Sequence, residues 1–286
     1  MGAIIWLASY PKSGNTWMRV FLHNLLRNPR EPTGINSINQ FCLGEDEASL
    51  YNSLDPRPLS SLTNAEVMAL RPKVHELLTK ASPDSVFVKT HNILGEAEGA
   101  PLINLDCTAG AIYMLRNPLD VAISYAHHFG VDLDEAIAQL NYPVAGTPTT
   151  DMIARQYYGT WSMHVASWTQ VPFPARHVVR YEDMIENPLE TFRGVARFLG
   201  LDPPQERLER AISHSSFEQL QTQENEKGFV ERSQHSRFFR SGKIGQWRDD
   251  MSDRQVARLV ADHREQMARF GYLPEGYEAA EADGAP

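Results

Sequence analysis

The eight residues "YPKSGNTW", at positions 10–17, separate two apolar runs of different character. The first run, "AIIWLASY" at residues 3–10, is typical of a buried strand that ends at Pro11. The second run, at residues 16–27, has the spacing of an amphipathic helix. The sequence therefore predicts a strand, a tight polar loop and a helix, an arrangement that presents free backbone N–H groups to an anion.

The loop itself is rich in groups that bind anions. Gly14 allows the backbone to approach a ligand closely, and Lys12 supplies a full positive charge. No Asp or Glu stands nearby in the sequence to neutralise that charge. Further donors come from three side chains, which are Ser13, Asn15 and Thr16. We expect this loop to hold a phosphate or sulfate group.

The loop differs from the loop that binds nucleoside triphosphates. That loop has the form G-x-x-x-x-G-K-[ST], which this sequence lacks. The predicted strand ends carry Lys89, His91 and Arg116, and no acidic residue placed to hold Mg²⁺. A basic site of this kind favours a pre-activated anion, and we expect no metal.

The rest of the chain alternates predicted strands with predicted helices. Strands are expected at residues 85–91, 110–117 and 176–184, and helices at 63–82, 118–129, 131–140, 151–169 and 187–200. We expect the helix at 63–82 to be kinked or split at Pro72. This alternation predicts one three-layer α/β domain over residues 1–275, with a central parallel sheet flanked by helices. Residues 276–286 are expected to form an acidic flexible tail.

Composition excludes several classes of protein. The 286 residues include 27 Lys and Arg against 36 Asp and Glu, a net charge of −9, which argues against nucleic-acid binding. Two cysteines cannot form a disulfide framework, so a reducing cytoplasm is the expected compartment. No run approaches the ~20 apolar residues of a membrane span.

Three segments carry a resemblance to a known family. "YPKSGNTW" is similar to the 5′-phosphosulfate loop of the sulfotransferases that use 3′-phosphoadenylyl sulfate (PAPS). "LRNPLDVAISYAHHF" (115–129) and "FFRSGKIGQW" (238–247) resemble the two other signatures of that family. Shorter matches follow in family order: "KTH", "WSMHVASW", "RYEDM" and "SSF". The chain thus resembles a cytosolic-type, bacterial-like sulfotransferase domain. It departs from the family pattern at Asn15, Ser241 and Gln246, where threonine, lysine and aspartate are frequent.

The resemblance implies a donor, PAPS, and a product, adenosine 3′,5′-bisphosphate (PAP). Lys12 and the loop residues Ser13 to Thr16 would hold the 5′-phosphosulfate. The 3′-phosphate would be held by the second and third signatures, through Arg116, Ser124, Phe238, Arg240, Ser241 and Gly242. The adenine would contact Trp17, Tyr181, Ser216 and Phe217.

The same resemblance implies a catalytic set of three residues. Lys12 would stabilise the leaving oxygen, and Lys89 the equatorial sulfuryl oxygens. His91 would take the proton of the acceptor hydroxyl, a task that suits imidazole near neutral pH. His127 and His128 are rival bases, but their helical position favours packing or a place in the acceptor pocket.

The acceptor is expected to be a small-molecule or natural-product hydroxyl in preference to an amine. We expect its pocket to be formed by residues 31–62 and 130–150, whose apolar members are Phe41, Leu43, Tyr51, Phe129 and Tyr142. The acidic residues of these segments would instead suit a cationic or amino-sugar substrate. The sequence alone leaves both open.

Two other functions remain as alternatives. A P-loop kinase would require Mg-ATP, and the missing Gly-Lys-Ser/Thr argues against it. A non-catalytic nucleotide-binding module would not need Lys12, Lys89 and His91 together. Within the sulfotransferases, a carbohydrate-polymer enzyme is a further variant. The oligomeric state stays open, with a homodimer as one alternative.

Overall fold

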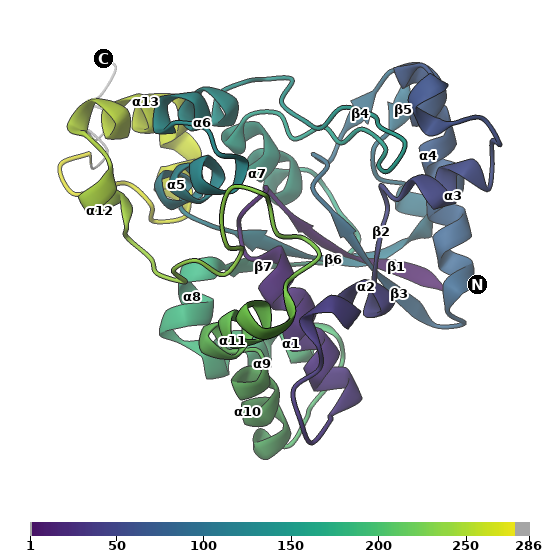
Figure 1. Ribbon diagram of the computed structural model, residues 1–286, viewed down its shortest axis with the longest axis horizontal. Helices are drawn as coiled ribbons and strands as arrows, with labels where there is room; N and C mark the ends of the chain where they lie inside the picture. The colour runs from purple at the N-terminus through teal and green to yellow at the C-terminus, as the bar shows by residue number, and fades with distance from the viewer. Residues whose placement is uncertain (1, 278–286) are drawn as a thin grey trace, which may run out of the picture.

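The computed structural model describes residues 2–277 and contains a parallel sheet of five strands (Figure 1). The strand order is β2-β3-β1-β6-β7, and every pairing between neighbours is parallel. The strands are β1 (Ala3–Ser9), β2 (Cys42–Gly44), β3 (Ser85–Thr90), β6 (Thr108–Leu115) and β7 (Arg176–Arg180). All five strands therefore end at the same edge of the sheet, where ligands bind in α/β proteins.

Helices cover both faces of this sheet, because its central strands are apolar on both sides. Trp6 of β1 belongs to the core under one set of helices, and its neighbour Leu7 to the core under the other set. The first set comprises α4 (Asn64–Leu78), α5 (Pro118–Phe129), α7 (Trp161–Gln170) and α13 (Asp253–Arg269). The second comprises α1 (Asn15–Arg27), α8 (Tyr181–Glu186), α9 (Pro188–Phe198) and α10 (Gln205–His214). In Figure 1 the two sets lie above and below the sheet.

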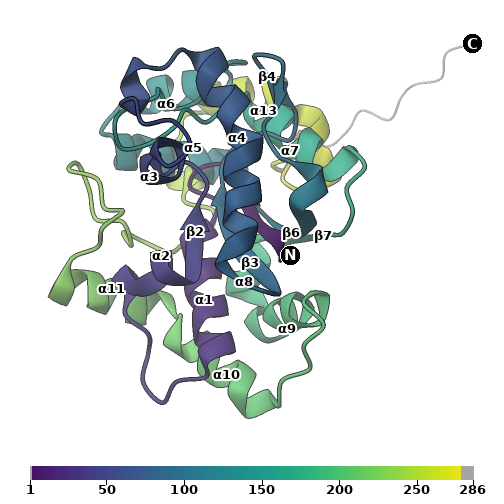
Figure 2. The same ribbon diagram turned by 90° about the vertical axis from the view of Figure 1, so that its right-hand side faces the viewer.

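Shorter elements complete the described part of the chain. They are α2 (Ile38–Phe41), α3 (Ala48–Asn52), α6 (Leu133–Leu140), α11 (Phe217–Lys227), α12 (Trp247–Asp250), the antiparallel pair β4 (Glu96–Ala97) and β5 (Ala100–Pro101), and four 3₁₀ turns at Ile35–Ser37, Leu59–Ser61, Thr79–Ala81 and Leu105–Cys107. Figure 2 shows α11 beside α2, where Leu220 and Ile38 share a small core.

The prediction of a single three-layer α/β domain is confirmed, and so is the strand, loop and helix at the start of the chain. The domain limits at residues 1–275 stay a prediction. Trp161 and Trp168 are fully buried on α7, as core residues. The tail predicted at 276–286 falls almost entirely on residues 278–286, which lie outside the described residues.

Four local predictions were wrong. The helix predicted at 151–169 begins only at Trp161, where the Thr160 hydroxyl accepts from the Met163 N–H and caps α7. Residues 151–160 instead form isolated bridges to residues 47 and 146. The strand predicted at 176–184 ends at Arg180, because α8 begins at Tyr181. Pro72 does not split α4, which continues from Asn64 to Leu78, so that alternative was wrong, while a kink at Pro72 stays a prediction. Strand β2 was not predicted at all.

Among residues 2–277, no helix is both long and apolar enough to cross a membrane.

Candidate active site

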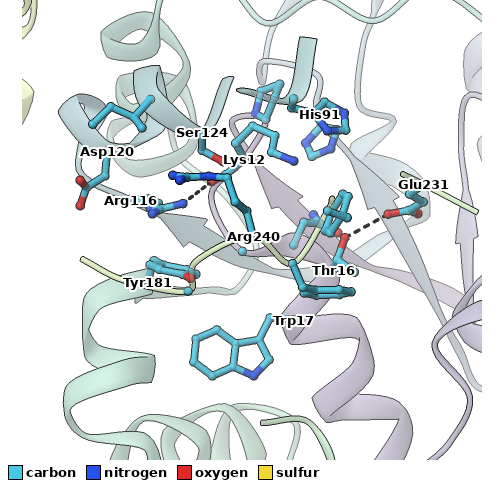
Figure 3. Close-up of a pocket in the computed structure, with 18 of the residues that line it drawn as sticks. Lys12, Thr16, Trp17, His91, Arg116, Asp120, Ser124, Tyr181, Glu231 and Arg240 are labelled. Carbon is cyan, nitrogen blue, oxygen red and sulfur yellow. Dashed lines mark hydrogen bonds between the residues drawn. The ribbon is translucent and has the colours of Figure 1, made fainter. Parts of the chain in front are cut away.

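A cavity of about 330 Å³ opens at the carboxyl ends of β1, β3, β6 and β7 (Figure 3). Segments that are distant in the sequence supply its polar lining; among them are the loop after β1, the end of β3, the residue after β6, helix α5 and the first residue of α8. Residues 228–247, which we call the strap, contribute further lining residues. Fifteen residues predicted from the sequence line the cavity: Lys12, Gly14, Asn15, Thr16, Trp17, Lys89, His91, Arg116, Ser124, Tyr181, Phe217, Phe238, Arg240, Ser241 and Gly242.

The loop after β1 has the backbone of an anion-binding turn. Gly14 has φ 97° and precedes α1 without a side-chain cap, and the first turn of α1 carries no acidic residue. The amides at the start of α1 and the positive end of its dipole are therefore left to a ligand. A Cβ on Gly14 would lie 2.8 Å from the Tyr181 ring, so the close approach requires glycine.

Lys12 projects from this loop toward the middle of the cavity (Figure 3). Its own φ is 68°, a left-handed conformation that is strained for a side-chain-bearing residue. The ammonium lies 4.1 Å from the centre of the Phe238 ring. Burial, followed by the positive charge of Arg116, lowers the Lys12 pKa to about 7. An anion bound beside Lys12 would favour its charged form and raise that pKa.

Contrary to the expectation that no acid lies near Lys12, Glu231 of the strap reaches the cavity. Its carboxylate accepts from the Thr16 hydroxyl at 3.0 Å and lies 3.8 Å from the Lys89 ammonium. Burial opposes its charge, but Lys89 and Arg19 together hold its pKa down at about 2. The expectation failed because Glu231 lies far from the loop in sequence.

His91 follows β3 with one ring nitrogen already engaged. Its Nδ1 lies 2.8 Å from the Ser9 carbonyl oxygen and 3.2 Å from the Ser9 hydroxyl. The carbonyl can only accept, so Nδ1 carries the proton and the lone pair is on Nε2. Burial, followed by the charge of Lys89, holds the His91 pKa well below its usual range. His91 is therefore neutral at pH 7 and able to accept a proton.

A buried carboxylate fixes the segment around His91 from behind. Glu45 accepts from the Thr90 hydroxyl and, at 2.7 Å, from the Asn92 amide, on either side of His91. Its charge is balanced by Arg71 at 2.6 Å, and His75 lies at 2.9 Å. Burial raises the pKa of Glu45, yet Arg71 and these hydrogen bonds bring it down to about 2. Glu45 is thus an ionised anchor for the strand end that carries Lys89 and His91.

A second basic site lies at the other end of the cavity. The Arg116 guanidinium stacks 4.2 Å from the centre of the Tyr181 ring and donates to the carbonyls of Lys12 and Lys243, each at 3.2 Å. Arg240 donates to the Gln246 amide oxygen at 2.7 Å. Arg240 belongs to the strap and Arg116 donates to the Lys243 carbonyl of the strap, so this basic site depends on the strap being held in position.

Asp120 fixes the C-terminal end of the strap. The carboxylate, which is buried on α5, accepts from the backbone N–H groups of Gly245 at 2.7 Å and Trp247 at 3.2 Å. In the middle of the strap, the Glu224 carboxylate accepts from the N–H groups of Phe238 and Phe239, at 2.7 and 2.9 Å. The strap is therefore anchored to helices α11 and α5 at its middle and at its C-terminal end.

Aromatic side chains line the space below the two basic sites. Trp17 and Tyr181 meet edge to face with ring centres 5.6 Å apart, as Figure 3 shows. Gly242 has φ 64°, and a Cβ there would lie 2.4 Å from the Phe217 ring. The Nε1 of Trp17 and the Nε of Arg116 are buried without a hydrogen-bond partner among residues 2–277, which leaves donors for a bound molecule.

Some predicted residues lie elsewhere. Ser13 and Ser216 do not line the cavity: the Ser13 hydroxyl is buried, and the Ser216 oxygen accepts from the Gln219 N–H at the start of α11. Asn15 does line it, but its amide nitrogen donates inward to the Leu7 carbonyl at 2.8 Å. Of the expected apolar acceptor residues only Phe129 lines the cavity; Tyr51 and Phe41 pack in the cores, and Leu43 and Tyr142 also lie outside the lining. Of the rival histidines His128 lines it and His127 does not.

Six polar lining residues were not singled out from the sequence, namely Asp46, Asp120, Thr147, Gln156, Tyr158 and Glu231. A signal existed for Asp120, which lies inside the second signature. The other five stand in irregular segments without any periodic pattern. No group of three or more His, Cys, Asp or Glu side chains within the described residues could hold a metal ion.

Comparison with known proteins identifies the family. The family model for the sulfotransferase domain matches residues 4–271. Sulfotransferase 1A1 of Canis lupus familiaris is 25% identical over 278 residues, which cover 93% of this chain and 83% of that protein. Sulfotransferase 1B1 of the same species is 28% identical over 271 residues, covering 92% and 82%.

Solved structures share the fold. Retinol dehydratase in complex with androsterone and inactive cofactor PAP superposes with a TM-score of 0.64 at 19% identity, over 92% of this chain and 80% of that one. Mouse sulfotransferase SULT7A1 complexed with PAP gives a TM-score of 0.60 at 20% identity, over 93% and 84%. The match to the family model across nearly the whole chain shows that this protein belongs to the PAPS-dependent sulfotransferase family.

Proposed function

We propose that this enzyme transfers the sulfuryl group of PAPS to a hydroxyl, in preference to an amine, of a small-molecule or natural-product acceptor. The observation that carries the proposal is the placement of Lys12, Lys89 and His91 on the lining of one cavity that also holds Arg116 and Arg240. Two separated basic sites match a donor with a 5′-phosphosulfate and a 3′-phosphate. The structures of retinol dehydratase with androsterone or retinol support a small-molecule acceptor.

The residues present fit this donor. The uncapped start of α1 and Lys12 suit the phosphosulfate, and Arg116 and Arg240 suit the 3′-phosphate. Trp17, with its unpartnered Nε1, suits the base. The same lining contains Ser124, Ser241 and Gly242, which we assign with the two arginines to the 3′-phosphate. It also contains Tyr181 and Phe217, which we assign with Trp17 to the adenine base.

The chemistry that PAPS supplies is displacement at sulfur by the acceptor oxygen, with the bisphosphate as leaving group. His91 accepts the acceptor's proton at Nε2, since Nδ1 is held by Ser9. Lys89 and Lys12 stabilise the charge that develops on the sulfuryl and leaving oxygens. The cavity keeps these groups partly out of water, which strengthens each of these interactions.

The test is transfer of radiolabelled sulfate from PAPS to a panel of phenols, alcohols and amines without Mg²⁺. We expect transfer by the wild type, and loss of both donor affinity and turnover in Lys12→Ala. Lys227→Ala, an exposed change at the end of α11, is the matched control. A Lys12→Ala enzyme with unchanged donor affinity and rate would contradict the assignment of the loop. The cytoplasmic location stays a prediction.

A further inference from the structure

We infer that the acceptor is a hydroxyl-bearing amine that binds as a cation, with its ammonium group on Asp46. This inference rests on the proposed function, because it concerns the acceptor of that same site. It is carried by the acceptor wall, which we define as Asp46, Thr147, Gln156 and Tyr158, all four lining the cavity.

The acceptor wall lies on the His91 side of the cavity. The rings of His91 and Tyr158 meet edge to face with their centres 6.3 Å apart. Asp46 lies close to both Tyr158 and Lys89: after burial, the charge of Asp46 helps to raise the Tyr158 pKa, and Lys89 partly offsets the burial that raises the Asp46 pKa. A molecule that presents its hydroxyl to His91 would therefore meet Asp46 with another part of its structure.

The wall is fixed before any ligand arrives. The Asp46 carbonyl accepts from the Ala154 N–H at 2.7 Å, which joins the turn after β2 to residues 152–154. Thr147 and Gln156 exchange two hydrogen bonds, each 3.0 Å, and Tyr158 donates its N–H to the Ala145 carbonyl at 2.7 Å. A wall built from paired backbone holds its polar side chains in place at little entropic cost on binding.

Two of these polar side chains have hydrogen-bonding or charge-pairing capacity that their neighbours do not use. The Gln156 side chain is buried, at 2% exposure, and its amide nitrogen has no hydrogen-bond partner among residues 2–277. The Asp46 carboxylate accepts from its own backbone N–H but takes part in no ion pair among residues 2–277, and the nearby Lys89 lies 3.8 Å from Glu231 instead. A buried amide without a partner and a buried carboxylate without a countercharge are both unfavourable. A ligand that forms an ion pair with Asp46 and accepts a hydrogen bond from Gln156 would account for both side chains.

The charges select the chemical class of that ligand. An apolar alcohol would exclude water from Asp46 and Gln156 and offer neither side chain a polar group, whereas an ammonium group would form an ion pair with the Asp46 carboxylate. An oxygen on the same molecule would accept from Gln156. The lysines and arginines of the cavity do not exclude a cation, because the bound donor brings several negative charges of its own.

The experiment compares acceptors that differ only in the ammonium group. Tyramine and para-ethylphenol form one such pair, and glucosamine and glucose form a second. We expect the wild type to prefer the amine by tenfold or more in kcat/KM, and Asp46→Asn to lose that preference, measured in each variant as the ratio of kcat/KM for the amine to kcat/KM for its neutral partner. Glu47→Gln removes the exposed neighbouring carboxylate, which does not line the cavity, and should leave the preference unchanged.

Binding to the PAP complex, measured by titration calorimetry, gives the same comparison without turnover. The inference is overturned if the wild type uses or binds the neutral acceptor with the same efficiency or affinity as the corresponding amine. It is also overturned if the preference for the amine survives Asp46→Asn. Absence of saturable amine binding to the wild-type PAP complex overturns it too. Failure of the proposed function has a different signature, which is that PAP itself does not bind and no hydroxyl receives sulfate.

Discussion

The Nη2 of Arg19 lies 2.7 Å from both carboxylate oxygens of Glu231, across 212 positions of sequence. Arg19 belongs to α1, the helix that begins at the phosphate loop, and Glu231 belongs to the strap. The pair therefore joins the two segments that would enclose the donor. The Arg19 side chain is 1% exposed and that of Glu231 is 20% exposed, so water screens the pair only in part.

We expect Glu231→Gln to lower the free energy of unfolding by about 1–3 kcal/mol, because Arg19 would stay buried without a countercharge. Urea unfolding followed by fluorescence measures this change. Glu226→Gln, an exposed change on α11, is the control and should leave the midpoint unchanged. Equal stability of the two variants would show that the Arg19–Glu231 pair does not hold the strap.

We expect His91→Ala to reduce kcat by about 10²–10⁴-fold, because it removes the group to which we assign the acceptor's proton. PAP affinity should change little, since His91 is bonded to Ser9 and not to the phosphate loop residues. Steady-state kinetics and PAP titration measure the two effects separately. His127→Ala, outside the cavity lining, is the control. Substantial turnover by His91→Ala would remove His91 from the role of base.

The rate should not fall through titration of His91 between pH 6 and 8. Burial and Lys89 keep the His91 pKa well below its usual range, so the base is already neutral there and is lost only in more acidic solution. A pH profile of kcat with a PAPS-saturated enzyme measures this. A rising limb centred near pH 7 that stays at the same pH for acceptors of different hydroxyl pKa would contradict it.

PAP affinity should weaken as the pH rises above 7. Free Lys12 has a pKa of about 7, and the bound phosphates favour the charged form and raise it. Binding above pH 7 therefore takes up a proton, and Kd should increase by up to about tenfold per unit between pH 7.5 and 9. Calorimetry in buffers of different ionisation enthalpy counts the proton. Lys12→Arg, which stays charged, should remove most of the dependence.

Gly14→Ala should weaken PAP binding and destabilise the fold by about 1–3 kcal/mol. The residue has φ 97°, and the added Cβ would contact the Tyr181 ring at 2.8 Å. Gly34→Ala is the matched control, since Gly34 has an ordinary negative φ and open space around its Cα. PAP titration and thermal unfolding give the two readouts. Equal PAP affinity and equal thermal stability of the two variants would mean that PAP binding does not require the left-handed backbone conformation at Gly14.

The sequence predicted the site best where the chemistry is local. Lys12, Gly14 and Thr16 share one loop, and Lys89 and His91 share one strand end, so short motifs were sufficient to place them. Patterns also identified the parallel sheet, because buried strands and amphipathic helices differ in period.

Residues brought in by tertiary structure were not predictable in this way. Glu231 and Asp46 stand in irregular segments, and their place in the cavity depends on contacts with Arg19 and with residues 152–154. Asn15 was expected to face the ligand, yet its amide is used by the Leu7 carbonyl. The false helix at 151–160 has the same origin, because its backbone pairs with residues 47 and 146 instead of with itself.

The measurement that tests the central claim most directly is titration calorimetry of the wild type with PAP, without Mg²⁺, beside a titration with ATP and Mg²⁺. The account predicts tight binding of PAP that needs no metal, and weak or no binding of Mg-ATP. Preference for Mg-ATP would contradict it and assign the loop at residues 10–17 to a kinase. Binding of neither nucleotide would contradict it as well.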